Sequence, residues 1–267
     1  MSAAVLATLL VSGGCGSATS SASPTRTKDW QLVFQDDFSG GRLDTSKWNT
    51  CHWWNDDGCT IKSSNEIEWY LPSQVAVAGG QLDLTADRAS GVRSDGKQHD
   101  YVSGMVTTGP PKYQRSSKFD FTYGRVTARM KFPKGDGLWS AFWMLPSTSK
   151  SLPEIDIVEV LGNDPAEWIL HLHPKNEDAK QYSQRVRRAD LADGWHDVGL
   201  VWEPGRLEWL IDNKVVWSVT GSDVPDEPMY LVANLAVGGA YPGPPTASTE
   251  FPTQMNIEEV QVWQRPT

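Results

Sequence analysis

From Trp30 onward, short runs of alternating apolar and polar residues are separated by Gly, Pro, Asn and Asp. Alternation with a period of two is typical of a strand that buries one face. The stretch YGRVTARMKF places Val126, Ala128, Met130 and Phe132 on the same face. This pattern predicts a half-buried strand.

Turn residues predict how the strands connect. QVAVAGGQLDLTADR predicts two strands about a Gly79-Gly80 turn. HDVGLVWEPGRLEWLIDNKVVWSV predicts a meander with turns at Pro204-Gly205 and Asp212-Asn213, and MNIEEVQVWQ predicts a last strand. The nearest helix candidate, ADLADGWHD, is short. Many strands without an amphipathic helix predict an all-β sandwich or jelly roll.

The N-terminal region predicts export. Ala3 to Val11 is an apolar run of about nine residues, which suits a signal segment and is too short to span a membrane. Cys15 follows two glycines, as at a lipoprotein processing site; a plain cleaved signal is the alternative. We therefore expect a leader over 1–15, a disordered Ser/Thr-rich tether over 16–28 and one domain over 29–267.

Two of the three cysteines lie close together in CHWWNDDGC. Cys51 and Cys59 could close a small loop by a disulfide in an oxidising compartment. This pairing leaves Cys15 as the odd cysteine, which a lipid anchor explains.

Composition limits the classes of molecule that the protein could bind. The 267-residue chain carries a formal net charge of -9, which argues against nucleic acid because phosphate binding needs a basic face. Its 13 Trp exceed ordinary usage, and flat rings suit either a core or the C–H faces of sugars. We expect a monomer that binds a polysaccharide and meets a membrane only through a lipid anchor.

The stretch PEIDIVEVLG sets three carboxylates in a hydrophobic strand. Side chains alternate along a strand, so Glu154 and Asp156 share a face. A regular strand would place the third member at position 158, whereas it stands at Glu159. A one-residue β-bulge around Ile157-Val158 would return Glu159 to the face of the other two.

Strand geometry then favours a particular chemistry. Four strand steps separate the two glutamate backbones by about 13 Å, and inward-leaning side chains leave about 5 Å between the carboxyl groups. Retaining glycosidases need about 5–5.5 Å, and inverting ones about 6.5–9.5 Å. A metal site or a solvated strand face are the alternatives for such a carboxylate cluster.

Several motifs in order resemble glycoside hydrolase family 16, in particular its laminarinase-like branch. EIDIVE is similar to the family's bulged Glu-any-Asp-any-any-Glu pattern. GDGLWSAFWMLP, SSNEIEWY and NLAVGGAYPGPP resemble three further family segments, and the likeness runs from Trp30 to Gln264. The resemblance implies a concanavalin A-like β-jelly roll with a concave groove for a polysaccharide.

The resemblance also implies roles for individual residues. Glu154 would be the nucleophile, Asp156 its assistant and Glu159 the general acid/base. His173 would sit near Glu159, although His171 lies on the same face and leaves this choice open. The remaining substrate-binding candidates are Asn65, Glu66, Trp139, Trp143 and Asn234.

Catalysis in this family needs no cofactor, but many members hold a structural calcium ion on the convex side. The matching positions are Asp37, the backbone of Gly80, and Glu258. A bound ion there would raise stability rather than take part in the chemistry.

Two departures bear on the substrate. Met105 stands where laminarinase-like members commonly have Arg. The Cys51–Cys59 loop is Trp-rich, and we expect it to form one end of the groove, with Trp53 and Trp54 either stacking on sugars or packing on the sandwich.

The sequence thus predicts a retaining endo-glycosidase that acts on β-1,3 or mixed β-1,3/1,4-glucan. The same chemistry on a β-galactan or a bacterial exopolysaccharide, and transglycosylation, are the nearest alternatives. A non-catalytic glucan-binding protein is the alternative from another class.

Overall fold

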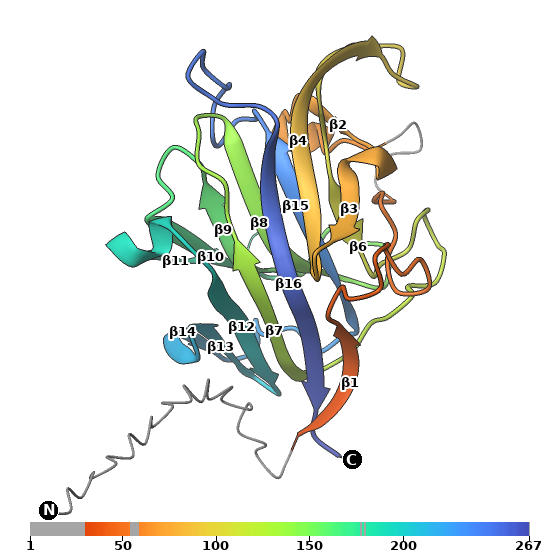
Figure 1. Ribbon diagram of the computed structural model, residues 1–267. Helices are drawn as coiled ribbons and strands as arrows, with labels where there is room; N and C mark the ends of the chain where they lie inside the picture. Colours follow the sequence, from red (N-terminus) through yellow and green to blue (C-terminus); the bar gives the residue numbers. More distant parts are fainter. Residues whose placement is uncertain (1–29, 54–58, 177, 179, 267) are drawn as a thin grey trace, which may run out of the picture.

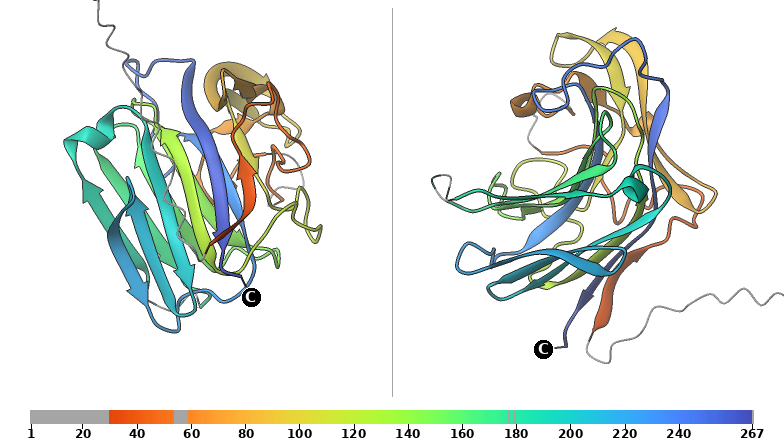
Figure 2. Two further views of the ribbon diagram at one scale, coloured as in Figure 1. Left: turned by 60° about the horizontal axis from the view of Figure 1, so that its bottom comes forward. Right: turned by 90° about the vertical axis from the view of Figure 1, so that its left-hand side faces the viewer.

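The computed structural model describes residues 30–53, 59–176, 178 and 180–266 (Figure 1). Two β-sheets lie one on the other as curved layers, which Figure 2 views from two further sides. The three short helices are single 3₁₀ turns at Lys62–Ser64, Pro72–Gln74 and Ala189–Ala192. The expected all-β jelly-roll sandwich is confirmed, and the helix candidate reduces to the last of these turns.

The larger sheet has ten strands in the order β14-β13-β12-β7-β16-β4-β5-β2, with β1 pairing with β16 and β3 with β4. The bounds of its strands are β1 (Gln31–Asp36), β2 (Glu68–Tyr70), β3 (Val75–Ala78), β4 (Gln81–Val92), β5 (Gln98–Ser103), β7 (Gly124–Lys131), β12 (His196–Glu203), β13 (Arg206–Ile211), β14 (Lys214–Thr220) and β16 (Thr253–Gln264).

The smaller sheet has six strands in the order β11-β10-β9-β8-β15-β6. Their bounds are β6 (Met105–Thr107), β8 (Leu138–Pro146), β9 (Glu154–Leu161), β10 (Glu167–His173), β11 (Tyr182–Arg187) and β15 (Met229–Val237).

The predicted turns lie where the sequence placed them. Gly79 and Gly80 join β3 to β4 with φ of 61° and 80°, a left-handed conformation that glycine adopts without strain. Asp212 and Asn213 join β13 to β14 with φ of 51° and 61°, which suits a tight hairpin turn. The hairpin and the meander are therefore confirmed.

The core fills the space between the two layers. Apolar side chains from both sheets form one cluster, and alternation along each strand supplies it. Six Trp side chains are buried: Trp48, Trp69, Trp143, Trp168, Trp202 and Trp209. Burial thus accounts for many of the Trp residues.

The predicted bulge in β9 is present. Phe142 and Trp143 on β8 pair with Val158 and Asp156, so β9 holds one extra residue, Ile157, at this point. The pairing with β10 skips a residue over the same stretch. Ile157 and Val158 are both buried in the core. Both side chains of the bulge thus face the core, and Glu159 returns to the face that carries Glu154 and Asp156.

The two ends of the described chain lie together. β1 pairs antiparallel with β16, and Gln31 lies opposite Gln264 (Figure 1). Across the described residues, no helix is long and apolar enough to cross a membrane.

Candidate active site

A groove opens over the smaller sheet, where β8, β9 and β10 run side by side. It contains two adjoining hollows of about 330 and 380 Å³. Six residues line both hollows, namely Ser64, Trp139, Glu154, Asp156, Glu159 and His173. The bulge therefore gathers all three predicted carboxylates in one groove.

Glu159 is almost enclosed, with 5% of its surface exposed. Trp139 donates its indole N–H to Glu159 Oε1 at 3.0 Å, and His171 Nδ1 lies 2.5 Å from Oε2. Burial and the nearby charge of Asp156 raise the pKa of Glu159, while the contacts with His171 and Trp139 oppose that rise. A raised carboxyl pKa favours the protonated form that a general acid requires.

Glu154 is the more open glutamate, with 23% of its side chain exposed. Its Oε1 lies 3.9 Å from His173 Nε2. Loss of water around the carboxyl, followed by the charge of Asp156, raises the pKa of Glu154 well above its ordinary value. The two glutamates thus share one strand face but differ in exposure and in partners.

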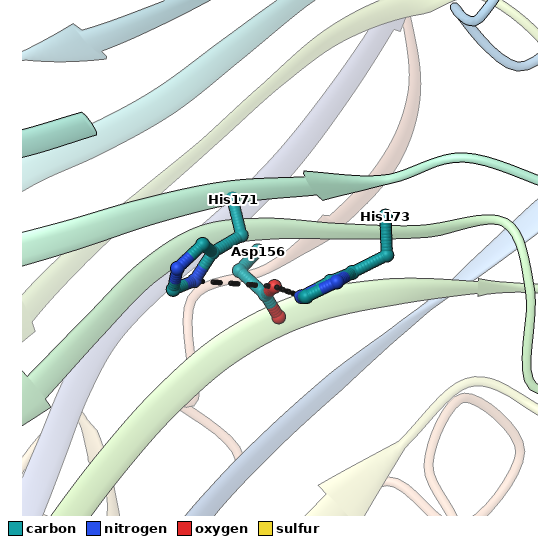
Figure 3. Close-up of side chains that lie close together, drawn as sticks. All are labelled: Asp156, His171 and His173. Carbon is teal, nitrogen blue, oxygen red and sulfur yellow. Dashed lines mark ion pairs between the residues drawn. The ribbon is translucent and has the colours of Figure 1, made fainter. Parts of the chain in front are cut away.

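The two histidines of β10 both point toward Asp156 (Figure 3), but the nearest carboxylate differs between them. His171 contacts Glu159, whereas His173 Nε2 lies 3.3 Å from Asp156 Oδ2. Burial alone would lower the pKa of His173, but Asp156 and Glu154 outweigh burial and raise the pKa to about 9. The expectation that His173 accompanies Glu159 is therefore corrected, because that place belongs to His171.

A chain of hydrogen bonds runs from the groove into the wall. Trp143 donates its indole N–H to Asn234 Oδ1 at 2.8 Å, and Asn234 Nδ2 donates to Tyr70 at 2.9 Å. Tyr70 in turn donates to Glu66 at 3.1 Å. Trp143, Asn234 and Glu66 all line the larger hollow. Trp143, however, is buried, and its N–H is already engaged with Asn234.

Other predicted positions lie at or beyond the edge of the groove. Asn65 is exposed in a left-handed conformation (φ 55°) and does not line either hollow. Met105 is buried beneath the site, so its departure from the family acts through packing. Trp53 donates to the Tyr230 hydroxyl at 2.7 Å, which supports packing on the sandwich. Trp54 lies outside the described residues.

The predicted disulfide between Cys51 and Cys59 is present. Cys59 belongs to a small apolar cluster that also contains Trp143 and Tyr230, and Cys51 and Trp53 pack against it. The two ends of the loop are therefore anchored on the wall of the groove.

Sequence reasoning missed three residues of the site, Ser64, Tyr70 and Tyr241. Ser64 and Tyr241 line the smaller hollow, and the Tyr241 ring lies edge-on to Trp139 at 5.6 Å. Tyr70 is fully buried and links Asn234 to Glu66. All three fall within segments that carried the family resemblance, so motif membership was the signal available.

The predicted calcium positions are committed to other partners. Asp37 Oδ1 accepts the Ser39 backbone N–H at 3.1 Å and its hydroxyl at 2.8 Å. Glu258 Oε2 accepts a hydrogen bond from the Arg129 Nε–H at 2.8 Å. Gly80 lies in the β3–β4 turn. Calcium needs six to eight oxygen ligands, whereas a guanidinium already neutralises one of the two carboxylates. The donor set as arranged does not fit calcium.

The fold and the site together define a class of protein that acts on polysaccharides. Its features here are an all-β sandwich, a groove over one sheet, two glutamates on one strand and aromatic rings beside them. Such a protein can hold a chain of sugars and break a glycosidic bond by carboxylate chemistry. The sequence profile described as "Glycosyl hydrolases family 16" matches residues 63–258. The chain belongs to this family.

Known proteins agree with this assignment. The chain is 31% identical to "Endo-1,3-1,4-beta-glycanase EglC" of Rhizobium meliloti, over 86% of this chain and 51% of that protein. It is 33% identical to "Glucan endo-1,3-beta-glucosidase A1" of Niallia circulans, over 87% of this chain and 37% of that protein. It thus spans about half or less of these two relatives.

A solved structure covers more of the fold. The endo-beta-1,3-glucanase from Pyrococcus furiosus superposes with a TM-score of 0.78 at 29% identity, over 89% of this chain and 95% of that chain. The resemblance to laminarinase-like members of family 16 is thus confirmed.

Proposed function

We propose that this protein is a retaining endo-glycosidase that hydrolyses internal β-1,3 or mixed β-1,3/1,4 linkages of a glucan. One observation carries the proposal: the bulge in β9 brings Glu154, Asp156 and Glu159 to the same groove. The names of the family relatives, which are glucanases of these linkages, support the substrate class.

In the first step a Glu154 carboxylate oxygen attacks the anomeric carbon. The bond from that carbon to the leaving sugar breaks, and Glu159 gives its proton to the leaving oxygen. Burial and the charge of Asp156 raise the pKa of Glu159, as the acid role requires. They raise the pKa of Glu154 as well, so the division of roles between the two glutamates rests on the family resemblance.

In the second step water attacks the glycosyl–Glu154 ester. Glu159 takes the water proton, and the bond to Glu154 breaks with the original anomeric configuration restored. A sugar hydroxyl in place of water would give transglycosylation.

Asp156 and the histidines act on the reacting carboxylates rather than on the sugar. Asp156 lies between the two glutamates and raises the pKa of both. His171 orients Glu159 through a direct contact. Trp139, Tyr241 and Glu66 line the hollows on either side and would hold neighbouring sugars by stacking and hydrogen bonds.

The test is digestion of a polysaccharide panel by wild type, Glu154→Gln and Glu159→Gln. We expect wild type to cut laminarin or mixed-linkage glucan internally, with products that initially keep the β-anomer by NMR. Both variants should lose about 10²–10⁴-fold in rate. Glu159→Gln should recover partly on an aryl glycoside whose leaving group needs no proton, whereas Glu154→Gln should not.

The other outcomes separate the alternatives. Cleavage of only a galactan or an exopolysaccharide would keep the mechanism and reject the glucan. Binding without cleavage by all three proteins would identify a glucan-binding protein. An initial α-anomer would contradict retention.

We also propose that the protein is exported, with 1–15 as leader, 16–28 as tether, and Cys15 acylated. The apolar run before Cys15 and the Cys51–Cys59 disulfide support export, although residues 1–29 lie outside the described structure. Fractionation of cells that produce wild type or Cys15→Ser tests the anchor: only wild type should remain with membranes.

A further inference from the structure

Three potential metal ligands gather at the centre of the groove (Figure 3). His171 and His173 stand two residues apart on β10, so both side chains lie on one face. Asp156 lies directly opposite His171 on β9. One ligand atom from each of the three residues lies within 4.8 Å of the other two.

The carboxylate oxygen at the centre of this group is unsatisfied. Asp156 is 4% exposed, and across the described residues its Oδ2 has no hydrogen-bond partner. His173 Nε2 at 3.3 Å and His171 Nδ1 at 3.9 Å form ion pairs with it, but neither makes a hydrogen bond to it. The oxygen thus keeps an unused acceptor site in a buried setting.

Tetrahedral bonds of about 2.0–2.1 Å place neighbouring ligand atoms about 3.3–3.4 Å apart. The His173–Asp156 distance of 3.3 Å matches this spacing, and His171, at 3.9 Å from Asp156, would need to move inward to bind the same ion. We propose that Asp156, His171 and His173 bind a divalent transition-metal ion, best represented by zinc, and that this ion inhibits the enzyme.

Ligand chemistry selects the metal. Two imidazoles and one carboxylate suit zinc, cobalt, nickel and copper, whereas magnesium and calcium prefer oxygen ligands alone. Three protein ligands leave the fourth position to water. Glu154 Oε1, 3.9 Å from His173 Nε2, is a further carboxylate beside the site.

Inhibition follows because the ion would bind atoms that the reaction needs. His171 Nδ1 contacts Glu159 and cannot hold the ion and that carboxylate in the same direction. Asp156 would bind the ion instead of acting on Glu154 and Glu159. The inhibitory part of the proposal rests on the proposed function, but the binding part does not.

Cobalt reports binding directly through its visible absorption. Wild type is titrated with Co²⁺ at pH 8, where metal binding must release the proton held by His173, and Zn²⁺ is then added. We expect one Co²⁺ per chain, displaced by Zn²⁺ but not by Ca²⁺ or Mg²⁺. His171→Asn and His173→Asn should each weaken binding by about 10-fold or more, and the double variant should lose the spectrum.

His99→Asn is the matched control, since His99 pairs with a single carboxylate, Asp95, at 3.2 Å. It should bind Co²⁺ as wild type does. Either no Co²⁺ spectrum in wild type or an unchanged spectrum in the double variant would overturn the site. The latter result would place the ion elsewhere, for example at Cys15.

Activity is measured on the same samples. Glucan cleavage should fall in proportion to zinc occupancy and return when a chelator removes the ion. Full cleavage by the zinc-loaded protein would overturn inhibition. Zinc binding together with no cleavage by the metal-free protein would refute the proposed function and leave the metal site standing.

Discussion

At the scale of single residues, the wall of the groove contains a second pair of acids. Glu66 and Glu68, on either side of Ile67, are both buried, and burial together with the charge of Glu68 raises the pKa of Glu66. Glu68 Oε2 accepts the Val237 backbone N–H at 2.7 Å. Two charged carboxylates close together in a buried site repel each other, so the protonated form of one of them is favoured. We therefore expect the pair to hold a proton inside the fold.

This proton makes stability depend on pH. Burial, followed by the charge of Glu68, raises the pKa of Glu66 well above its ordinary value, and burial also raises the pKa of Glu68. Because the folded pKa values exceed the unfolded ones, this contribution is complete below the unfolded pKa. It is lost as pH rises through the folded pKa.

We therefore expect Glu68→Gln to be more stable than wild type at pH 8. The Gln oxygen can still accept from the Val237 N–H, and a neutral side chain at position 68 removes the charge repulsion with Glu66. Tm should rise by roughly 2–4 °C for each kcal/mol gained, and the advantage should vanish near pH 4.5. Thermal melts over this pH range measure it. Glu250→Gln, at an exposed position, is the control and should change Tm little.

At the scale of elements, β9 carries the three carboxylates of the site and pairs with its neighbours in an irregular register. Ile157 is the extra residue relative to β8, and on the other side Ile157 and Val158 together lie opposite one residue of β10. If Ile157 were deleted, the strand would become regular, and the third glutamate, now two positions after Asp156, would still face the groove. The extra residue therefore adds length between the glutamates, and the bulge keeps Glu159 on the groove face despite it.

Deletion of Ile157 should accordingly leave a folded protein. We expect a loss of about 2–5 kcal/mol in the free energy of unfolding, since a buried Ile side chain disappears. Activity should fall about 100-fold because the glutamates move closer together. Circular dichroism, chemical denaturation and glucan assays measure these effects.

Deletion of Ile155 is the matched comparison. Ile155 is equally buried on the same strand but lies outside the bulge, so its removal turns Glu154 toward the core. That variant should fail to fold or lose all activity. Equal behaviour of the two deletions would contradict the proposed role of the bulge.

The strands also show which features of the fold could be predicted from the sequence. Alternation in YGRVTARMKF and the turn residues predicted β7, the β3–β4 hairpin and the β12–β14 meander because these signals are local. The bulge was predictable because the carboxylate spacing broke a period of two. The partner of each histidine depends on the register of β10 against β9, and no local pattern encodes that long-range pairing.

At the scale of the whole molecule, the Cys51–Cys59 disulfide joins the two ends of a loop at the groove wall. Removing the Cys51–Cys59 disulfide should cost about 2 kcal/mol, or roughly 4–8 °C in Tm. Thermal melts of Cys15→Ser with and without reductant measure this cost. Cys51→Ser/Cys59→Ser in the same background should melt at the reduced temperature and ignore reductant. An unchanged Tm on reduction would contradict a structural disulfide.

The pairing of β1 with β16 has a consequence for how this domain can be connected to other proteins. Because Gln31 lies opposite Gln264, a few residues suffice to join them, and the backbone could be reopened at an exposed turn such as Gly79-Gly80 as a circular permutant. For the same reason the domain can be inserted into a surface loop of a host protein, since its entry and exit need little more space than two neighbouring strands.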